Sequence, residues 1–153
     1  MKKTLIVGYG NTLRGDDGAG VRVAERIAGD HPEIDCLIAH QLFPEMSEQI
    51  AQYESVVFID AAVGIDHLVV SEITPQEAGN SWSSHRCSPQ SLISGTTVLA
   101  GIDPSRCYLI QIPAFTFNYG DDLSPETAHL VDKGVEVVNN ILQHHTTQAP
   151  KTL

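Results

Sequence analysis

The stretch from Val56 to Ile59 places four large apolar residues in succession, and Asp60 follows them directly. A strand with one solvated face alternates polar and apolar side chains, whereas a strand covered by helices on both faces is apolar throughout. The run therefore predicts a strand over 56–62 at the centre of a parallel or mixed sheet. A carboxylate directly after such a strand is costly to bury, so Asp60 must be paired, bound to a metal or exposed at the strand end.

Shorter apolar runs alternate with helical patterns along the rest of the chain. Further strands are predicted at 4–8, 34–42, 68–73 and 108–112, and helices at 21–28, 45–52, 89–99 and from Pro125 onward. This alternation predicts an α/β fold, a three-layer sandwich whose twisted, mostly parallel sheet of about five strands is flanked by helices. The length of 153 residues suits one domain better than two. We expect that domain over 1–143 and a flexible tail over 144–153.

The composition limits the partners and the compartment. Asp and Glu outnumber Lys and Arg by 19 to 9, which gives a net charge of −10. Binding to nucleic acid relies on clusters of Lys and Arg, so we expect no such partner. No apolar run approaches the roughly 18–20 residues that cross a membrane. The three cysteines fit neither a disulfide framework nor a cysteine zinc site. We expect a cytoplasmic protein, without a membrane segment, that acts as a monomer.

Polar residues follow three of the predicted strands. In an α/β sandwich, binding sites form beyond the C-terminal ends of the strands. The residues at these positions are Asn11, Asp16 and Asp17 after the first strand, His40 and Gln41 after the second, and Asp60 after the third. The first and third strands are usually neighbours in this topology, so we expect the acids of the first loop to lie near Asp60.

The loop from Gly8 to Gly20 has some features of a nucleotide-binding turn. The third glycine of a dinucleotide fingerprint would fall at Leu13, however, and two carboxylates would repel a pyrophosphate from the helix N-terminus. A helix cap explains one acid, but not two acids among five glycines. The loop therefore predicts an acidic site instead of a phosphate site.

A histidine would complete a metal site with these acids. His85 lies in the polar stretch that leads to the helix predicted at 89–99, and His40 is the alternative at a strand end. One imidazole and two carboxylates suit Ni, Zn, Co, Mn or Fe, and the spacing does not choose among them. We interpret Cys87, two residues after His85, as an incidental cysteine. The sequence has no nucleophile elbow and no HExxH motif.

Three motifs together resemble the hydrogenase maturation proteases, the endopeptidases that trim the C-terminus of the [NiFe]-hydrogenase large subunit. The motifs are Gly8-x-Gly10-Asn11-x-Leu13-x-x-Asp16-Asp17-Gly18-x-Gly20, Phe58-Ile59-Asp60-Ala61, and Ser84-His85 before a Leu-containing helix. They occur in the right order at a matching chain length. The resemblance implies an α/β fold with a twisted central sheet between helices.

The resemblance also implies a substrate and a set of site residues. The substrate is the large-subunit precursor after nickel insertion, whose C-terminal extension is removed. Nickel is recognised by Asp17, Asp60 and His85, and Asp16 is a neighbouring acid that could replace Asp17. Either nickel or one of the carboxylates Asp17, Asp16 and Asp60 would activate water. The family often has Glu at the position of Asp17, so the shorter side chain changes the reach to the metal.

Substrate contacts are expected from Asn11, His40 and Gln41. The segment that begins at His40 is glycine-rich in some family members, and its different composition here indicates a different large-subunit partner. We expect the nickel to arrive with the substrate and to bind the free protein weakly. Two alternatives remain open at this point: a metal-binding chaperone or checkpoint that does not cut, and a general metallo-aminopeptidase.

Overall fold

The computed structural model describes residues 2–73, 87–100 and 106–147. Five strands form one sheet in the order β2-β1-β3-β5-β4. Their bounds are β1 Lys2–Tyr9, β2 Asp35–Ala39, β3 Tyr53–Ala62, β4 Val69–Glu72 and β5 Cys107–Pro113. All neighbours pair in parallel except β4, which runs antiparallel to β5 at the edge. The predicted α/β fold with a mostly parallel five-stranded sheet is confirmed.

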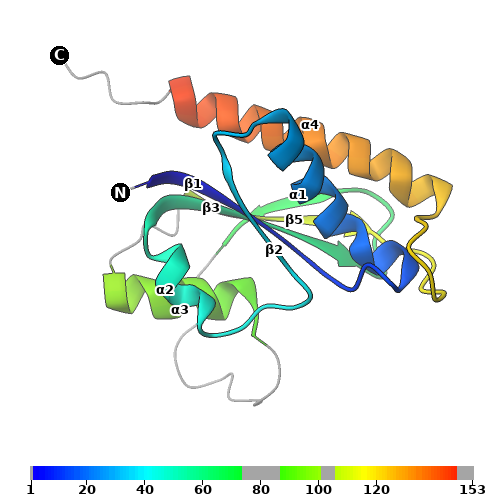
Figure 1. Ribbon diagram of the computed structural model, residues 1–153, viewed down its shortest axis with the longest axis horizontal. Helices are drawn as coiled ribbons and strands as arrows, with labels where there is room; N and C mark the ends of the chain where they lie inside the picture. Colours follow the sequence, from blue (N-terminus) through cyan, green and yellow to red (C-terminus); the bar gives the residue numbers. More distant parts are fainter. Residues whose placement is uncertain (1, 74–86, 101–105, 148–153) are drawn as a thin grey trace.

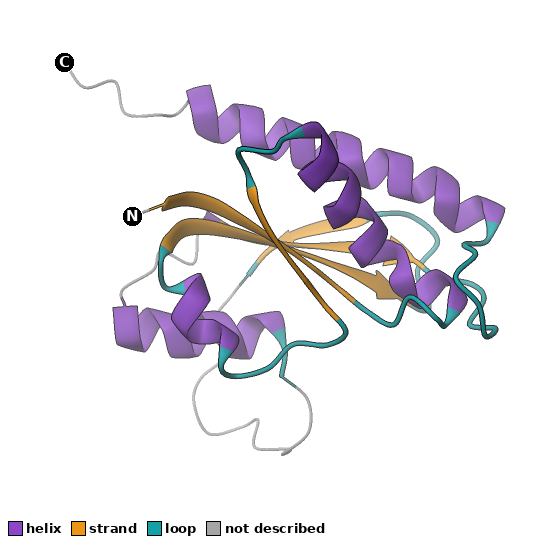
Figure 2. Ribbon diagram, viewed as in Figure 1, coloured by secondary structure: helices purple, strands orange, loops and turns teal. Residues whose placement is uncertain are grey.

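Helices cover both faces of this sheet (Figures 1 and 2). Helices α1 (Ala19–Asp30) and α4 (Pro125–Thr147) lie against one face and contact each other. Helices α2 (Met46–Ile50) and α3 (Pro89–Ala100) lie together against the other face. A short 3-10 helix, η1 (Gly15–Gly18), connects the loop after β1 to α1. The three predicted layers are therefore present.

The central strand β3 contributes to both hydrophobic cores. Val57 and Ile59 pack in the core under α1 and α4, whereas Val56 and Phe58 pack in the core under α2 and α3. All four side chains are fully buried. The uninterrupted apolar run thus reflects a strand that is covered on both faces, as its sequence predicted.

The C-terminal helix is longer than the sequence predicted. It continues to Thr147, so residues 144–147, which the sequence assigned to the tail, are helical. No glycine or proline follows Gly134 until Pro150, so the sequence contains no helix-breaking residue that would end the helix at 143. The rest of the predicted tail, 148–153, lies outside the described residues. In the part of the chain that the structure describes, no helix is long and apolar enough to cross a membrane.

Candidate functional site

Close backbone contacts bring the first loop to the end of β3. A Cβ atom added to Gly20 would lie 2.1 Å from the carbonyl oxygen of Ile59 and 3.1 Å from the Cα of Asp60. Gly10 has a φ of +144°, and a Cβ there would lie 2.1 Å from the carbonyl oxygen of Asp17. Only glycine fits at these two positions. The glycines of the first motif therefore allow the start of α1 to lie directly against Asp60.

Asp17 lies half-buried at this edge, and the loop fixes its orientation. The backbone N–H of Asn11 donates a hydrogen bond to Asp17 Oδ2 at 2.8 Å. The side-chain oxygen of Asn11 in turn accepts the N–H of Leu13 at 3.0 Å, which closes a tight turn. The structure therefore places Asn11 next to Asp17, where it holds the carboxylate in position.

Asp60 lies half-buried at the end of β3, close to Asp17. Burial is the main reason that its pKa is raised, and the negative charge of Asp17 raises it further. Hydrogen bonds from the Tyr9 hydroxyl and the Ala61 N–H act in the opposite direction, and the pKa lies at about 6. A carboxylate whose ionised form is disfavoured by burial and by a neighbouring carboxylate is a favourable place for a cation. The structure thus brings Asp17 and Asp60 together as the sequence predicted.

Tyr9 is a member of this site that the sequence analysis missed. Its hydroxyl donates a hydrogen bond to Asp60, and both burial and the charge of Asp60 raise its own pKa well above the usual value. Tyr9 therefore stays neutral and remains a hydrogen-bond donor. The pairing of Gly8 with Ile59 brings the next residues of the two strands, Tyr9 and Asp60, side by side. Only the register between β1 and β3 reveals this neighbour.

Cys87 lies close enough to Tyr9 that a negative charge on its sulfur would raise the pKa of the tyrosine. Burial raises the pKa of the Cys87 thiol, although a contact of 3.8 Å with the Ser91 hydroxyl opposes this effect. A thiol with a raised pKa is a poor nucleophile at neutral pH. Cys87 is therefore not suited to attack a peptide bond, which agrees with its interpretation as an incidental cysteine.

Asp16 faces away from this pair and is completely buried. Its Oδ2 accepts the N–H groups of Phe115 (2.8 Å) and Thr116 (3.0 Å) and the hydroxyl of Ser124 (2.8 Å). Its Oδ1 accepts the N–H of Ser124 at 2.7 Å. Burial alone would raise the pKa of Asp16, but these hydrogen bonds outweigh it and lower the pKa to about 2. This placement corrects the expectation that Asp16 could replace Asp17 or act as the base.

The partner of Asp16 is the segment 114–124 between β5 and α4, which the sequence analysis did not connect with the site. Gly15 N–H donates to Gly120 O at 2.9 Å, Gly120 N–H to Leu13 O at 2.8 Å, and Asp16 N–H to Thr116 O at 2.9 Å. Figure 1 shows this segment beside the N-terminal end of α1. The two loops thus form one hydrogen-bonded unit at the C-terminal edge of the sheet.

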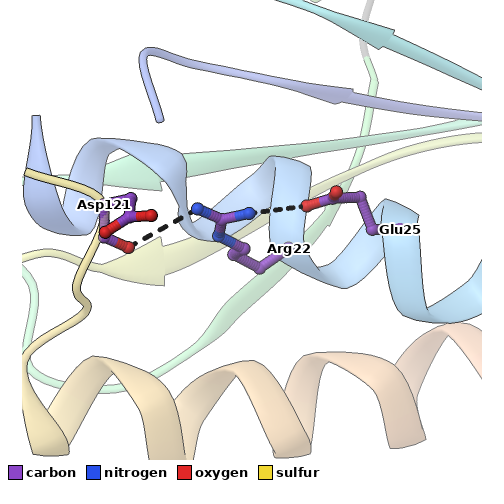
Figure 3. A network of polar contacts seen from close by, with 3 residues as sticks. All are labelled: Arg22, Glu25 and Asp121. Carbon is purple, nitrogen blue, oxygen red and sulfur yellow. Dashed lines mark hydrogen bonds and ion pairs between the residues drawn. The ribbon is translucent and has the colours of Figure 1, made fainter. Parts of the chain in front are cut away.

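Arg22 of α1 adds a further contact to the same segment. Its guanidinium donates to Glu25 Oε1 at 3.0 Å and to the backbone carbonyl of Asp121 at 3.5 Å (Figure 3). The Glu25 contact joins residues three apart on the helix surface. Arg22 therefore connects the first turns of α1 with the end of the 114–124 segment.

His40 and Gln41 follow β2, and both side chains are exposed. The loop after β1 is tied to this strand end, because Gly10 N–H donates to Ala39 O at 3.1 Å. Within the described part of the chain, neither residue forms a hydrogen bond with Asp17 or Asp60. His40 and Gln41 thus lie along the same edge as the acids, and their expected contact with the substrate stays a prediction.

The described residues do not form a complete metal site. Among residues 2–73, 87–100 and 106–147, no three His, Cys, Asp or Glu side chains lie close enough to hold a metal ion. Asp17 and Asp60 are two of the three predicted ligands. The third, His85, lies outside the described residues.

The same fold occurs in a solved structure, the [NiFe] hydrogenase maturation protease HycI from Thermococcus kodakarensis KOD1. The TM-score is 0.71 and the sequence identity 25%, over 93% of both chains. The chain has the fold of the [NiFe] hydrogenase maturation proteases. The resemblance that the three motifs predicted is thereby confirmed, and in this structure the first two motifs lie at one edge of the sheet, whereas the third lies outside the described residues.

Two further solved structures share the maturation-protease fold at lower sequence identity. The maturation protease HybD from Thermococcus kodakarensis has a TM-score of 0.65 and 24% identity, over 91% of this chain and 98% of that one. The hydrogenase maturating endopeptidase HybD from E. coli has a TM-score of 0.68 and 18% identity, over 93% of both chains. These names agree with the prediction of a peptidase. Comparison of the sequence with protein-family models and with curated proteins gives no match.

Proposed function

We propose that the protein is a cytoplasmic, monomeric endopeptidase that removes the C-terminal extension of a nickel-loaded [NiFe]-hydrogenase large-subunit precursor. The observation that carries this proposal is the pair Asp17 and Asp60, which meet at the C-terminal edge of a maturation-protease fold. The sequence resemblance rests on the same segments. Its three motifs are the first loop, the end of β3 and the polar stretch with His85.

The two carboxylates suit the recognition of a nickel ion that the substrate carries. Burial and the charge of Asp17 disfavour the ionised form of Asp60, and a divalent cation removes that cost. Asp17 and Asp60 would each supply an oxygen ligand and His85 a nitrogen ligand, which is a set that nickel accepts.

The same pair supplies a candidate general base for the attacking water. A base works best when its pKa is close to the working pH, and the pKa of Asp60, at about 6, meets this condition. The Tyr9 hydroxyl holds one side of this carboxylate by a hydrogen bond. We therefore assign proton abstraction to Asp60 while it is not bound to nickel, and the orientation of the nickel-bearing substrate to Asp17.

A mass measurement tests the proposal. The purified protein is mixed with the nickel-loaded large-subunit precursor of the same organism, and with the nickel-free precursor as the control. We expect a loss of mass that equals one C-terminal peptide, and only from the nickel-loaded form. Binding without any loss of mass would instead support a checkpoint that does not cut. Turnover of short peptides by the protein with added metal alone would support an aminopeptidase.

His85→Ala and His40→Ala form a matched pair in the same assay. We expect His85→Ala to abolish processing and His40→Ala to retain the cleavage step. Full activity of His85→Ala would assign the third ligand to His40 instead.

A further inference from the structure

Large apolar side chains are exposed beside the Asp17–Asp60 pair. Leu13 is 53% exposed, Val63 69%, Phe115 49% and Tyr119 85%. They belong to the segments that follow β1, β3 and β5. We call these four residues the apolar edge surface. Single exposed apolar residues are common on proteins, whereas a group of them at one edge indicates an interaction site.

Hydrogen bonds join the segments that carry these four residues in two places. Gly120, next to Tyr119, donates its N–H to Leu13 O at 2.8 Å. Ala114, next to Phe115, donates its N–H to Ala62 O at 2.9 Å, and Ala62 precedes Val63. The segments that carry the apolar edge surface are therefore joined, from the loop of Asp17 to the end of the strand that carries Asp60.

The backbone under this surface is held in place from inside the protein. Asp16 accepts the N–H groups of Phe115 and Thr116 on one oxygen and the N–H of Ser124 on the other. Arg22 holds the carbonyl of Asp121 at the far end of the segment (Figure 3). The exposed side chains thus stand on a preformed backbone, which lowers the entropy lost when a partner binds.

Acidic groups outnumber basic ones in the segments of the apolar edge surface and indicate the charge of its partner. Asp121 and Asp122 are exposed directly after Tyr119 and Gly120, and Asp17 and Asp60 belong to the same segments as Leu13 and Val63, whereas Arg14 is an exposed basic residue next to Leu13. A second copy of this chain would bring the same acids against each other, on a protein whose net charge is −10. The electrostatics therefore favour a partner segment that carries Lys or Arg beside apolar side chains.

We propose that the apolar edge surface binds an extended segment of the large-subunit precursor, next to the peptide bond that is cut, through apolar side chains flanked by basic residues. This inference rests on the proposed function, and it adds a binding surface that acts before the chemical step. Phe115 and Tyr119 are the central contacts, since buried aromatic residues dominate most protein interfaces.

The test separates binding from cleavage. Phe115→Ala and Tyr119→Ala remove exposed side chains, so thermal unfolding should show a folded protein close to the wild type. Val70→Ala is the matched control, because Val70 is 44% exposed on the edge strand β4, outside this surface. Affinity for the nickel-loaded precursor is measured by biolayer interferometry, and kcat and KM by mass spectrometry.

We expect each aromatic variant to raise Kd and KM about tenfold, while kcat at saturating precursor stays unchanged. Val70→Ala should bind and cleave as the wild type does. The double variant Asp121→Asn with Asp122→Asn should slow association several-fold, and added salt should reduce this difference.

The outcomes distinguish this inference from the proposed function. Wild-type cleavage with unchanged Kd and KM in both aromatic variants would overturn the docking surface and leave the proposed function intact. Binding that depends on Phe115 and Tyr119 without any cleavage would support the surface and overturn the endopeptidase. If the aromatic variants changed only self-association of the protein, the surface would be an interface between two copies.

Discussion

Asp16 and Asp17 are adjacent in sequence, yet their carboxylates serve two different regions of the molecule. Asp16 is fully buried and accepts four hydrogen bonds, which lower its pKa to about 2. Asp17 lies at the surface edge beside Asp60, whose pKa is raised to about 6. In the first region the ionised carboxylate stabilises the fold. In the second region ionisation costs stability, as is typical of a functional site.

The largest expected effect is the loss of processing when Asp60 of the candidate site is replaced. Asp60→Asn removes the general base and one metal ligand, but its side-chain oxygen can still accept the Tyr9 hydrogen bond. We expect processing to fall by about 10²- to 10⁴-fold. The free energy of unfolding at pH 7 should rise by about 1–3 kcal/mol, since the unfavourable charge is gone. Mass spectrometry and urea unfolding measure the two effects. A loss of both activity and stability would make Asp60 a structural residue.

Asp16→Ala should have the opposite profile. It leaves three N–H groups and one hydroxyl of the 115–124 segment without their acceptor, so we expect a loss of about 3–5 kcal/mol in the free energy of unfolding. Ser124→Ala, which removes one of these bonds and the cap on Thr127 N–H, should cost about 1–2 kcal/mol. Urea unfolding compares both variants with the wild type. A stable Asp16→Ala variant without activity would return Asp16 to the functional site.

The pH dependence of stability separates the two regions further. The pKa of Asp60 is raised from 3.8 to about 6, so the folded state binds the proton more tightly. The contribution of Asp60 to the free energy of unfolding therefore falls by up to about 3 kcal/mol as the pH rises from 4 to 6. The pKa of Asp16 is lowered from 3.8 to about 2, so its stabilisation is present above pH 4 and is lost as the pH falls towards 2.

Unfolding curves between pH 2 and pH 7 test these two contributions. Asp60→Asn should gain stability over the wild type only above about pH 4, and the gain should be complete above about pH 6. A gain that is equal at every pH would show that the raised pKa does not cause it.

A glycine pair on α1 tests the contact that joins the first loop to Asp60. Gly20→Ala places a methyl group against the carbonyl of Ile59, and we expect a loss of about 1–3 kcal/mol together with reduced processing. Gly29→Ala lies on the same helix with no atom within 4 Å of the added methyl group. It should gain about 0.5–1 kcal/mol and keep full activity. Equal behaviour of the two variants in thermal unfolding and processing would show that the contact at Gly20 is unimportant.

The smallest expected effect is that of Tyr9→Phe. It removes the hydrogen bond that lowers the pKa of Asp60, so this pKa should rise above 6. The acid limb of the pH–activity profile should move to higher pH by several tenths of a unit, and activity at pH 7 should fall a few-fold. A profile that keeps its midpoint would show that Tyr9 does not influence the ionisation of Asp60.

The fold was largely predictable from the sequence, because local patterns carried the necessary information. The apolar run from Val56 to Ile59 requires cover on both faces, and the alternation of strands and helices leaves few other arrangements. The end of α4 was missed because no local signal stops the helix at 143. The motif of glycines and acids also placed Asp17 near Asp60, since adjacent parallel strands present their C-terminal ends at one edge.

Only the tertiary structure decided that Asp16 has a structural role and that Asp17 lies at the candidate site. The two residues have the same chemistry and adjoining positions, so their sequence context does not tell which one meets the 115–124 segment. The register of β1 and β3 revealed Tyr9 as a neighbour of Asp60. Hydrogen bonds of Gly120 with Leu13 and of Ala114 with Ala62, residues far apart in the sequence, joined the segments of the apolar edge surface. The sequence by itself determined which residue types reach the edge of the sheet. Burial and long-range hydrogen bonds then decided which carboxylate stabilises the fold and which one is available to a substrate. Burial and these hydrogen bonds depend on groups that are distant along the chain, so the local sequence does not reveal them.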